Sequence, residues 1–316
     1  MSEPRFHLPE AAQIHTRTMP DGAEIRALIL PHPMARANLL VLNGRADFLE
    51  KWADAYAILH AAGFGIASWD WRGQGLSTRT CQTGAGHIDS FDQWLDDFDA
   101  LASFALQSLP AAPWLAVGHS MGAHLLLRWL ADPARGAHAM RENLRGAALI
   151  SPFFGLGMSW PLRVAVLQQA RREVARGNGA AFAWGQKPYG PMQKAATRML
   201  LLTASRERFD DEHRWLASNP DLAIGGVSWG WLAAFARSEA TLESRPLETL
   251  DLPLLMLLAS REQLVSLPAA RRIASRLPNC EAHSIPSAAH ELLREADPPR
   301  QSTLSHITKF ADKILA

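Results

Sequence analysis

Residues 114–130 read WLAVGHSMGAHLLLRWL, a short apolar run followed by a Gly-x-Ser-x-Gly pentapeptide and a helical pattern. The pattern predicts a buried strand that stops at Gly118, reverses sharply through Ser120 and continues as a helix. Such a turn brings helix and strand so close that only glycine fits at positions 118 and 122, and it holds the serine in a strained conformation. We therefore expect a nucleophile elbow with the Ser120 hydroxyl exposed for reaction.

The pentapeptide alone is a weak signal. With 21 glycines in 316 residues, a bare Gly-x-Ser-x-Gly arises by chance in roughly one such chain in ten. Its context is more specific, because Pro113 opens the strand, the serine falls at the junction of strand and helix, and Asp132-Pro133 closes the helix. This context favours a reactive serine over a chance match.

Composition indicates an ordinary globular protein, with 48% hydrophobic and 20% charged residues. A net charge of +1 gives no reason to expect a nucleic acid partner, so specificity must come from a pocket. The two cysteines, Cys81 and Cys280, provide neither a disulfide framework nor a zinc-ligand spacing. Eleven tryptophans against two tyrosines suggest broad apolar walls in that pocket.

The N-terminal region contains acidic residues such as Glu3 and Glu10 and has no continuous apolar run of the kind that signal peptides contain. No later run reaches the length of a membrane span. We expect a soluble, cytoplasmic protein that can still contact a membrane surface transiently. The sequence does not indicate its oligomeric state.

Alternating strand and helix patterns run through most of the chain, which predicts an α/β fold with a mostly parallel sheet flanked by helices. A hairpin with an Asp-Gly turn is expected to start the sheet. In the helix that follows Ser90, we expect Asp92, Asp96 and Asp97 to face mostly solvent. The expected strands are 13–18, 23–30, 38–43, 64–69, 114–118, 146–150, 252–258 and 281–285, and the expected helices lie near 48–59, 91–105, 121–130, 268–277 and 302–315.

This alternation breaks after Ser151-Pro152, and about a hundred residues pass before the next convincing strand. The interval is mostly helical in pattern, so we predict a hydrolase-like core of residues 1–151 and 251–316 with an inserted helical cap, or lid, of residues 152–250. Five of the eleven tryptophans fall in this cap. Of these, Trp160, Trp184 and Trp229 are the expected substrate contacts.

The first cap helix is expected at 161–176, with Gly177 as its stop. Arg171, Arg172 and Arg176 on this helix could meet a lipid phosphate or an anionic membrane surface. Alternatively, they form a solvated face that complements the carboxyl end of the helix.

A serine hydroxyl is a poor nucleophile at neutral pH and needs a base within hydrogen-bond reach. Of the twelve histidines, His290 is placed correctly for this role, because it follows the last expected strand. A metal site is not indicated there, since Arg294 stands where an H-E-x-x-H motif would have its second histidine. His119 and His124 do not form a helical ligand pair either, so we expect neither a metal nor another cofactor.

The base needs an acid to orient it, and the loop after 252–258 has a single carboxylate, Glu262. Asp251 precedes the strand and is expected at the opposite edge of the sheet. For the oxyanion of the reaction, the expected donors are the backbone amides of Met121 and Arg45, and Gly44 lets the backbone approach closely. We expect the Arg45 side chain to be a structural ion-pair partner.

Taken together, these segments resemble the lysophospholipase and monoacylglycerol lipase branch of the α/β-hydrolases, and most closely the bacterial lysophospholipases of the L2 type. The resemblance rests on residues 41–45, the loop 70–77 (DWRGQGLS), the pentapeptide 118–122, the Glu262 loop and His290-Glu-Leu-Leu, with further similarity at 86–88, 205–209 and 225–231. It implies a carboxylic ester with one acyl chain as substrate. Glu262 replaces the usual Asp of the family, and Asn43 stands where many relatives have His.

These observations lead to the hypothesis of a cofactor-independent serine esterase that forms an acyl-enzyme on Ser120, with a small lipid-like ester as its substrate. A serine at the elbow excludes dehalogenases and epoxide hydrolases, which need a carboxylate there. An acyltransferase or a peptidase could use the same three residues, and a non-catalytic binding protein on a hydrolase scaffold is a further alternative.

Overall fold

The computed structural model describes residues 4–191 and 195–316, and its centre is an eight-stranded sheet in the order β1-β2-β4-β3-β5-β6-β7-β8. Strands β3 to β8 are parallel, whereas β2 pairs antiparallel with both β1 and β4 at one edge. The strands are β1 (Gln13–Thr18), β2 (Glu24–Leu30), β3 (Ala37–Leu42), β4 (Phe64–Trp69), β5 (Trp114–His119), β6 (Leu144–Ile150), β7 (Leu254–Ala259) and β8 (Cys280–Ile285).

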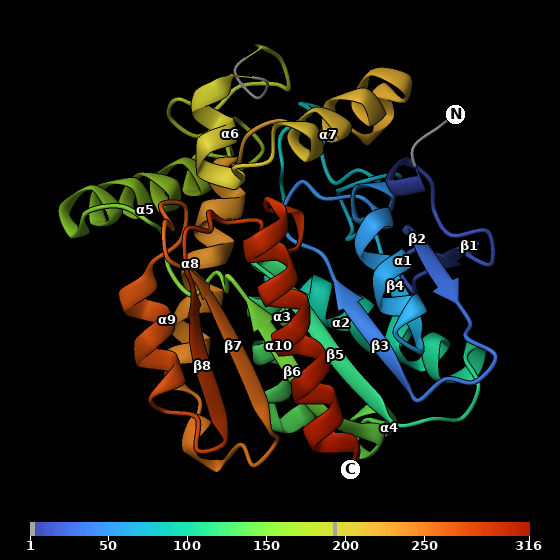
Figure 1. The fold of residues 1–316 in the computed structure, drawn as a ribbon. Helices are drawn as coiled ribbons and strands as arrows, with labels where there is room; N and C mark the ends of the chain where they lie inside the picture. The colour runs from blue at the N-terminus through green and yellow to red at the C-terminus, as the bar shows by residue number, and fades with distance from the viewer. Residues whose placement is uncertain (1–3, 192–194) are drawn as a thin grey trace.

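Helices cover both faces of this sheet (Figure 1). Helices α1 (Ala53–Ala61) and α10 (Asp297–Leu315) pack on one face, and α2 (Phe91–Ser108), α3 (Met121–Leu130) and α9 (Leu267–Ala274) pack on the other. A short α4 (Ala139–Asn143) leads into β6. The fold is therefore the expected α/β arrangement.

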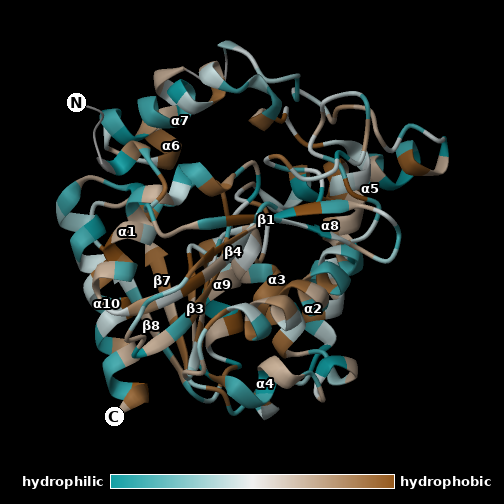
Figure 2. Ribbon diagram, turned by 90° about the vertical axis from the view of Figure 1, so that its right-hand side faces the viewer, coloured by the Kyte–Doolittle hydropathy of each residue, from teal (hydrophilic) through white to brown (hydrophobic). Residues whose placement is uncertain are grey.

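The central strands are apolar along their whole length because both of their faces are buried. In β7, Leu254 and Met256 join the core under α2 and α3, whereas Leu255 and Leu257 join the core under α1 and α10. Figure 2 shows the same pattern, with hydrophobic segments concentrated in the strands of the sheet. This continuous apolar pattern is the reason why the strands could be predicted to within about two residues.

Two local expectations were wrong. Helix α10 begins at Asp297 rather than near Ser302, because Pro298 and Pro299 lie in its first turn, where no backbone N–H is needed. Asp97 is buried rather than exposed: Arg72 donates to it from Nε at 2.9 Å and from Nη2 at 2.6 Å. The partner lies 25 positions away along the chain, so the helical pattern alone could not reveal it.

Between β6 and β7 the chain forms α5 (Trp160–Ala175), α6 (Ala196–Leu202), α7 (Arg206–Ser218) and α8 (Trp229–Ser244). In Figure 1, α5, α6 and α7 lie beyond the carboxyl ends of the parallel strands. Helix α8 reaches further down and contacts α2 and α3 as well as α5. The division into a core and a separate cap stays a prediction, but these helices cover the edge of the sheet at which Ser120 lies.

Within the part of the chain that the structure describes, none of the helices combines the length and the apolar character that crossing a membrane requires.

Candidate active site

Ser120 lies between β5 and α3 with φ 52° and ψ −113°, a backbone conformation that non-glycine residues rarely adopt. The turn is tight. A Cβ at position 118 would lie 2.7 Å from the Ala123 Cα, and one at position 122 would lie 2.2 Å from the Leu42 carbonyl oxygen. Backbone strain of this kind is typical of functional sites, and here the surrounding sheet and helix maintain it.

The structure brings Ser120, His290 and Glu262 together, although they are up to 170 positions apart in sequence. The Ser120 Oγ lies 2.9 Å from His290 Nε2, and His290 Nδ1 lies 2.7 Å from Glu262 Oε2. Each residue follows the carboxyl end of a parallel strand, β5, β8 or β7, so the three meet at one edge of the sheet. This is a serine, base and acid arrangement within hydrogen-bond reach.

Both oxygens of the Glu262 carboxylate form hydrogen bonds. Its Oε1 accepts hydrogen bonds from the backbone N–H groups of Leu264 (2.8 Å) and Val265 (3.2 Å), while Oε2 faces His290. Burial opposes ionisation of this carboxyl group, but the charge and hydrogen bond of His290 and the two backbone donors outweigh it and lower the Glu262 pKa. An ionised acid can hold the imidazole in one tautomer. Asp251, by contrast, is exposed at the other end of β7, where it accepts from Asn279.

The expected oxyanion donors are two backbone amides. That of Arg45 lies in the loop after β3, and that of Met121 lies at the start of α3. Within residues 4–191 and 195–316, neither amide donates a hydrogen bond to another protein group. A Cβ at Gly44 would come within 2.9 Å of both Asp47 Oδ2 and His119 Nδ1. Only glycine therefore allows the loop to pass this close to the elbow.

A second loop, residues 70–77, holds the loop after β3 in place through hydrogen bonds. Trp71 Nε1 donates to the Asn43 carbonyl at 2.8 Å, and Gln74 Oε1 accepts from the Ala46 amide. Asp70 is buried at the start of this loop and accepts from the amides of Leu49 (2.8 Å) and Leu76 (2.9 Å). The glycine-punctuated stretch noted in the sequence thus positions the loop after β3, which holds Gly44 and Arg45, a role that its spacing did not reveal.

A buried group of charges adjoins the site and joins α7 to the core. Lys51 Nζ lies 2.7 Å from Asp47, 2.7 Å from Glu291 and 2.8 Å from Glu212. Arg294 adds contacts to Glu291 (2.6 Å) and Glu212 (3.1 Å). We call these five residues the buried charge network. Sequence reasoning missed it because its members come from three distant segments.

Burial opposes the ionisation of the carboxylates in this network, yet the charge of Lys51 outweighs it. The Asp47 pKa is lowered, and the charges of Lys51 and Arg294 lower the Glu291 pKa to about 2. The Lys51 pKa is raised, because attraction to Asp47, Glu212 and Glu291 exceeds the cost of burial. Asp47, Glu291 and Lys51 are therefore charged near neutral pH.

This arrangement predicts an acid-sensitive fold. A carboxyl group whose pKa is lower in the folded than in the unfolded state stabilises the protein above its unfolded pKa, here 4.5, and this contribution is lost as the pH falls towards about 2. Urea unfolding at pH 7, 4 and 3 should therefore show falling stability. In a Glu291→Gln variant the stability difference from the wild type should be large at pH 7 and shrink towards pH 3. A difference that grows on acidification would contradict the assigned sign.

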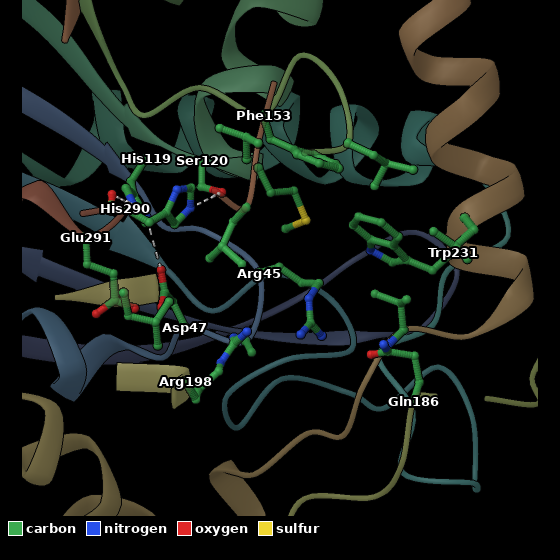
Figure 3. A pocket seen from close by; sticks show the side chains of 18 of the residues that line it. Arg45, Asp47, His119, Ser120, Phe153, Gln186, Arg198, Trp231, His290 and Glu291 are labelled. Carbon is green, nitrogen blue, oxygen red and sulfur yellow. Dashed lines mark hydrogen bonds and ion pairs between the residues drawn. The ribbon is translucent and has the colours of Figure 1, made fainter. Parts of the chain in front are cut away.

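Ser120 lines a cavity of about 310 Å³ (Figure 3). One side of it is lined by His119, Ser120 and His290, and another is apolar. Charged side chains, Arg45 and Arg198 among them, line a third side. The apolar lining consists of Ala46, Met121, Phe153, Leu156, Met158, Val166, Ala183, Trp184, Leu202, Val227, Trp231, Leu232, Leu264 and Val265.

The three tryptophans expected at the substrate occupy different places. Trp184 lines this cavity, although its side chain is still 60% exposed. Trp160 is 71% exposed and borders a separate groove beside α5. Trp229 is buried behind Trp184, with ring centroids 5.2 Å apart, and Trp231, two positions later, lines the cavity instead. The tryptophan count indicated an apolar wall, but the placement of Trp160 and Trp229 in it was wrong, because that depends on how the cap helices rotate.

The expected ion pair of the Arg45 side chain is also wrong. Its guanidinium donates to the Gly225 carbonyl oxygen at 3.1 Å, and no carboxylate among the described residues lies within ion-pair distance of it. Burial, followed by repulsion from Arg198, lowers the Arg45 pKa to about 10. This side chain therefore faces the cavity as a weakly compensated cation.

His119 lies directly behind the base. Its Nε2 is 3.3 Å from the His290 carbonyl oxygen, its ring centroid is 5.0 Å from that of His290, and its Nδ1 is 3.6 Å from Asp47 Oδ2. It therefore connects the His290 segment to the loop after β3. Across the described parts of the chain, no group of three or more His, Cys, Asp or Glu side chains is arranged to hold a metal ion.

A mostly parallel sheet with a strained serine between β5 and α3 defines an α/β-hydrolase, and the chain is a hydrolase of the carboxylic ester class. It belongs to the α/β-hydrolase family described as "Serine aminopeptidase, S33", whose model matches residues 33–297. It is similar to a protein named "Probable lysophospholipase L2" from Haemophilus influenzae, with 28% identity over 98% of this chain and 97% of the relative. It is also similar to "Lysophospholipase L2" from Escherichia coli K12, with 27% identity over 87% of this chain and 80% of the relative.

Solved structures share the fold at low sequence identity. A monoglyceride lipase from Saccharomyces cerevisiae matches with a TM-score of 0.72 and 15% identity, covering 96% of this chain and 97% of the other. A carboxyl esterase from Bacillus coagulans matches with a TM-score of 0.70 and 16% identity, covering 98% of this chain and all of the other, 100%. At these identities the likeness concerns the fold alone.

Proposed function

We propose that this protein hydrolyses carboxylic esters that carry a single acyl chain, of the lysophospholipid or monoacylglycerol type, through an acyl-enzyme on Ser120. The observation that carries the proposal is the hydrogen-bonded series from Ser120 through His290 to Glu262 at the floor of a cavity with an apolar wall. The names of the relatives from H. influenzae and E. coli support the same substrate type.

The proposed reaction uses the residues of this chain alone. As the Ser120 Oγ attacks the ester carbonyl, its proton passes to His290 Nε2, and Glu262 stabilises the imidazolium through Nδ1. The amides of Arg45 and Met121 donate to the oxyanion that develops on the carbonyl oxygen. His290 then gives the proton to the leaving alcohol. In the second half, His290 takes a proton from water, which attacks the acyl-enzyme. His290 then returns this proton to the Ser120 Oγ as the acyl–oxygen bond breaks and the fatty acid leaves.

A peptidase is the main alternative, and the description of the matching family raises it directly. An aminopeptidase must bind the free α-ammonium group of its substrate, which calls for an uncompensated carboxylate near the nucleophile. Here Asp47, Glu212 and Glu291 are occupied by Lys51 and Arg294. The charge balance of the cavity therefore favours an ester substrate over a peptide with a free amino terminus.

An activity screen tests this proposal, using esters of graded acyl length and varied head group alongside aminoacyl p-nitroanilides. Each methylene buried against the apolar wall contributes at most about 0.8 kcal/mol, which is about fourfold in kcat/KM. We expect kcat/KM for monoesters to rise over several carbons and then level off as the cavity fills. A flat profile, a strict preference for acetyl esters or faster cleavage of the anilides would contradict the proposal.

Two matched variants extend this screen. Trp184→Ala removes apolar surface from the cavity and should flatten the chain-length profile, whereas Trp160→Ala removes a ring that borders a different groove and should leave the profile unchanged. The reverse result would place the acyl chain along α5.

A further inference from the structure

Two arginines converge on the cavity from opposite sides. Arg45 follows β3 in the core, and Arg198 lies on α6 of the covering helices. Figure 3 shows both side chains reaching into the space below Ser120, on the side away from Phe153. Because they come from segments 153 positions apart, no motif in the sequence connects them.

Both arginines also line an adjoining cavity of about 190 Å³, which lacks Ser120 and His290. Its lining is more polar and includes Gln186, Lys187, Tyr189 and Glu212 together with backbone at Gly225 and Gly226. The two cavities adjoin each other at the arginines, because they share the lining residues Arg45, Ala46, Gln186, Arg198, Leu202 and Glu212. A substrate whose ester lies at Ser120 would reach this second space with its head group.

The charges in this region do not balance locally. The acidic side chains that border the cavity, Asp47, Glu212 and Glu291, are already paired with Lys51 and Arg294 in the buried charge network. Within the described chain, neither Arg45 nor Arg198 has a carboxylate within ion-pair distance. Their mutual repulsion is one cause of the lowered Arg45 pKa. An anion between them would remove this repulsion and accept directed hydrogen bonds from both.

We propose that Arg198 and the Arg45 side chain bind the phosphodiester of the substrate head group, so that the enzyme selects lysophospholipids over uncharged monoacylglycerols. This inference rests on the proposed function of the Ser120 site. It assigns the two walls of the site separately: the acyl chain lies against Trp184, Trp231 and Leu232, and the phosphate lies at the arginines. A glycerol backbone places a phosphate only a few bonds from the ester, which matches the position of Arg45 beside its own oxyanion amide.

The arginines on α5 provide a matched comparison. Arg171 is a cationic residue of the same covering helices, but it is exposed and borders the groove beside α5 instead of either cavity at the site. If a phosphate were recognised by surface charge alone, losing Arg171 would matter as much as losing Arg198. Arg171→Gln therefore controls for the loss of one positive charge.

The test compares lysophosphatidylglycerol, in which the phosphate is the only charge, with the monoacylglycerol of the same acyl chain, both kept below their micellar concentrations. In Arg198→Gln we expect the ratio of kcat/KM for the two substrates to fall by about tenfold to a hundredfold, the range for losing a hydrogen bond to a charged group. Arg198→Lys should recover part of this selectivity, and Arg171→Gln should keep the wild-type ratio. An equal effect of Arg198→Gln on both substrates would overturn the inference.

A second measurement does not depend on turnover of a phospholipid. Glycerophosphoglycerol should inhibit hydrolysis of a neutral p-nitrophenyl ester competitively, and Arg198→Gln should weaken this inhibition by about tenfold. Tighter inhibition by inorganic phosphate than by glycerophosphoglycerol would indicate a site for free phosphate and overturn the assignment to a head group. If the wild-type enzyme cleaves neither lipid while glycerophosphoglycerol still inhibits through Arg198, the proposed function fails and the anion site stands.

Discussion

Replacing Ser120 with alanine is expected to lower kcat for ester hydrolysis by about five to six orders of magnitude, because nucleophile and base act as one unit in serine hydrolases. The His290 imidazole would remain, but without the serine oxygen it has no proton to accept and no acyl-enzyme can form. The small residual rate would come from the oxyanion amides and from binding. The fold should persist, because alanine is compatible with the packing around the turn. Position 120 keeps its strained, positive φ in the variant.

This result is measured by steady-state kinetics and by covalent labelling. A fluorophosphonate should modify Ser120, and mass spectrometry should locate the adduct on the peptide that contains the pentapeptide. Labelling should disappear in Ser120→Ala and persist in Ser159→Ala, which changes an exposed serine before α5 that forms no capping hydrogen bond. Labelling that survives Ser120→Ala would mean that another residue is the nucleophile.

Replacing Glu262 with glutamine is expected to lower kcat by about ten-thousandfold, the effect of the matching change in a well-studied serine protease. Glutamine can still accept from the amides of Leu264 and Val265, so the loop should keep its conformation. Its NH₂ group would then face His290 Nδ1, which favours the tautomer with the proton on Nε2. That tautomer cannot accept the Ser120 proton.

Two further variants test whether Glu262 is the acid. Glu262→Asp shortens the side chain by one methylene and should retain part of the activity, because it keeps the carboxylate that orients His290. Asp251→Asn removes the other carboxylate near β7 and should leave kcat unchanged, because Asp251 is exposed at the opposite end of the strand. Near-normal turnover in Glu262→Gln together with loss of activity in Asp251→Asn would reverse the assignment.

Most of the fold could be predicted because it depends on local patterns. Strands buried on both faces need continuous apolar runs, and the elbow needs glycine on both sides of the serine. Short stretches of sequence, such as 114–122 and 254–259, are enough to meet these requirements. The late start assigned to α10 failed for a local reason too, since two prolines inside the first turn of a helix resemble a boundary.

The candidate reactive residues could also be predicted, because each one follows the carboxyl end of a strand. Parallel strands bring these ends to one edge of the sheet, so Ser120, Glu262 and His290 needed only the right order along the chain. The cap tryptophans had no such constraint. Whether Trp229 or Trp231 faces the cavity depends on how α8 packs against α2, α3 and α5.

The sequence by itself determined the α/β class, the strained turn at Ser120 and the chain order of the candidate nucleophile, acid and base, because all three follow from local backbone requirements. Only the tertiary structure decided which charges compensate one another. Lys51 contacts Asp47, Glu212 and Glu291, and Asp97 contacts Arg72, whereas neither Arg45 nor Arg198 has a carboxylate within ion-pair distance among the residues that the structure describes. Electrostatic interactions act through space between residues far apart in the chain, so the anion preference of the cavity became visible only after the core and the covering helices had been brought together.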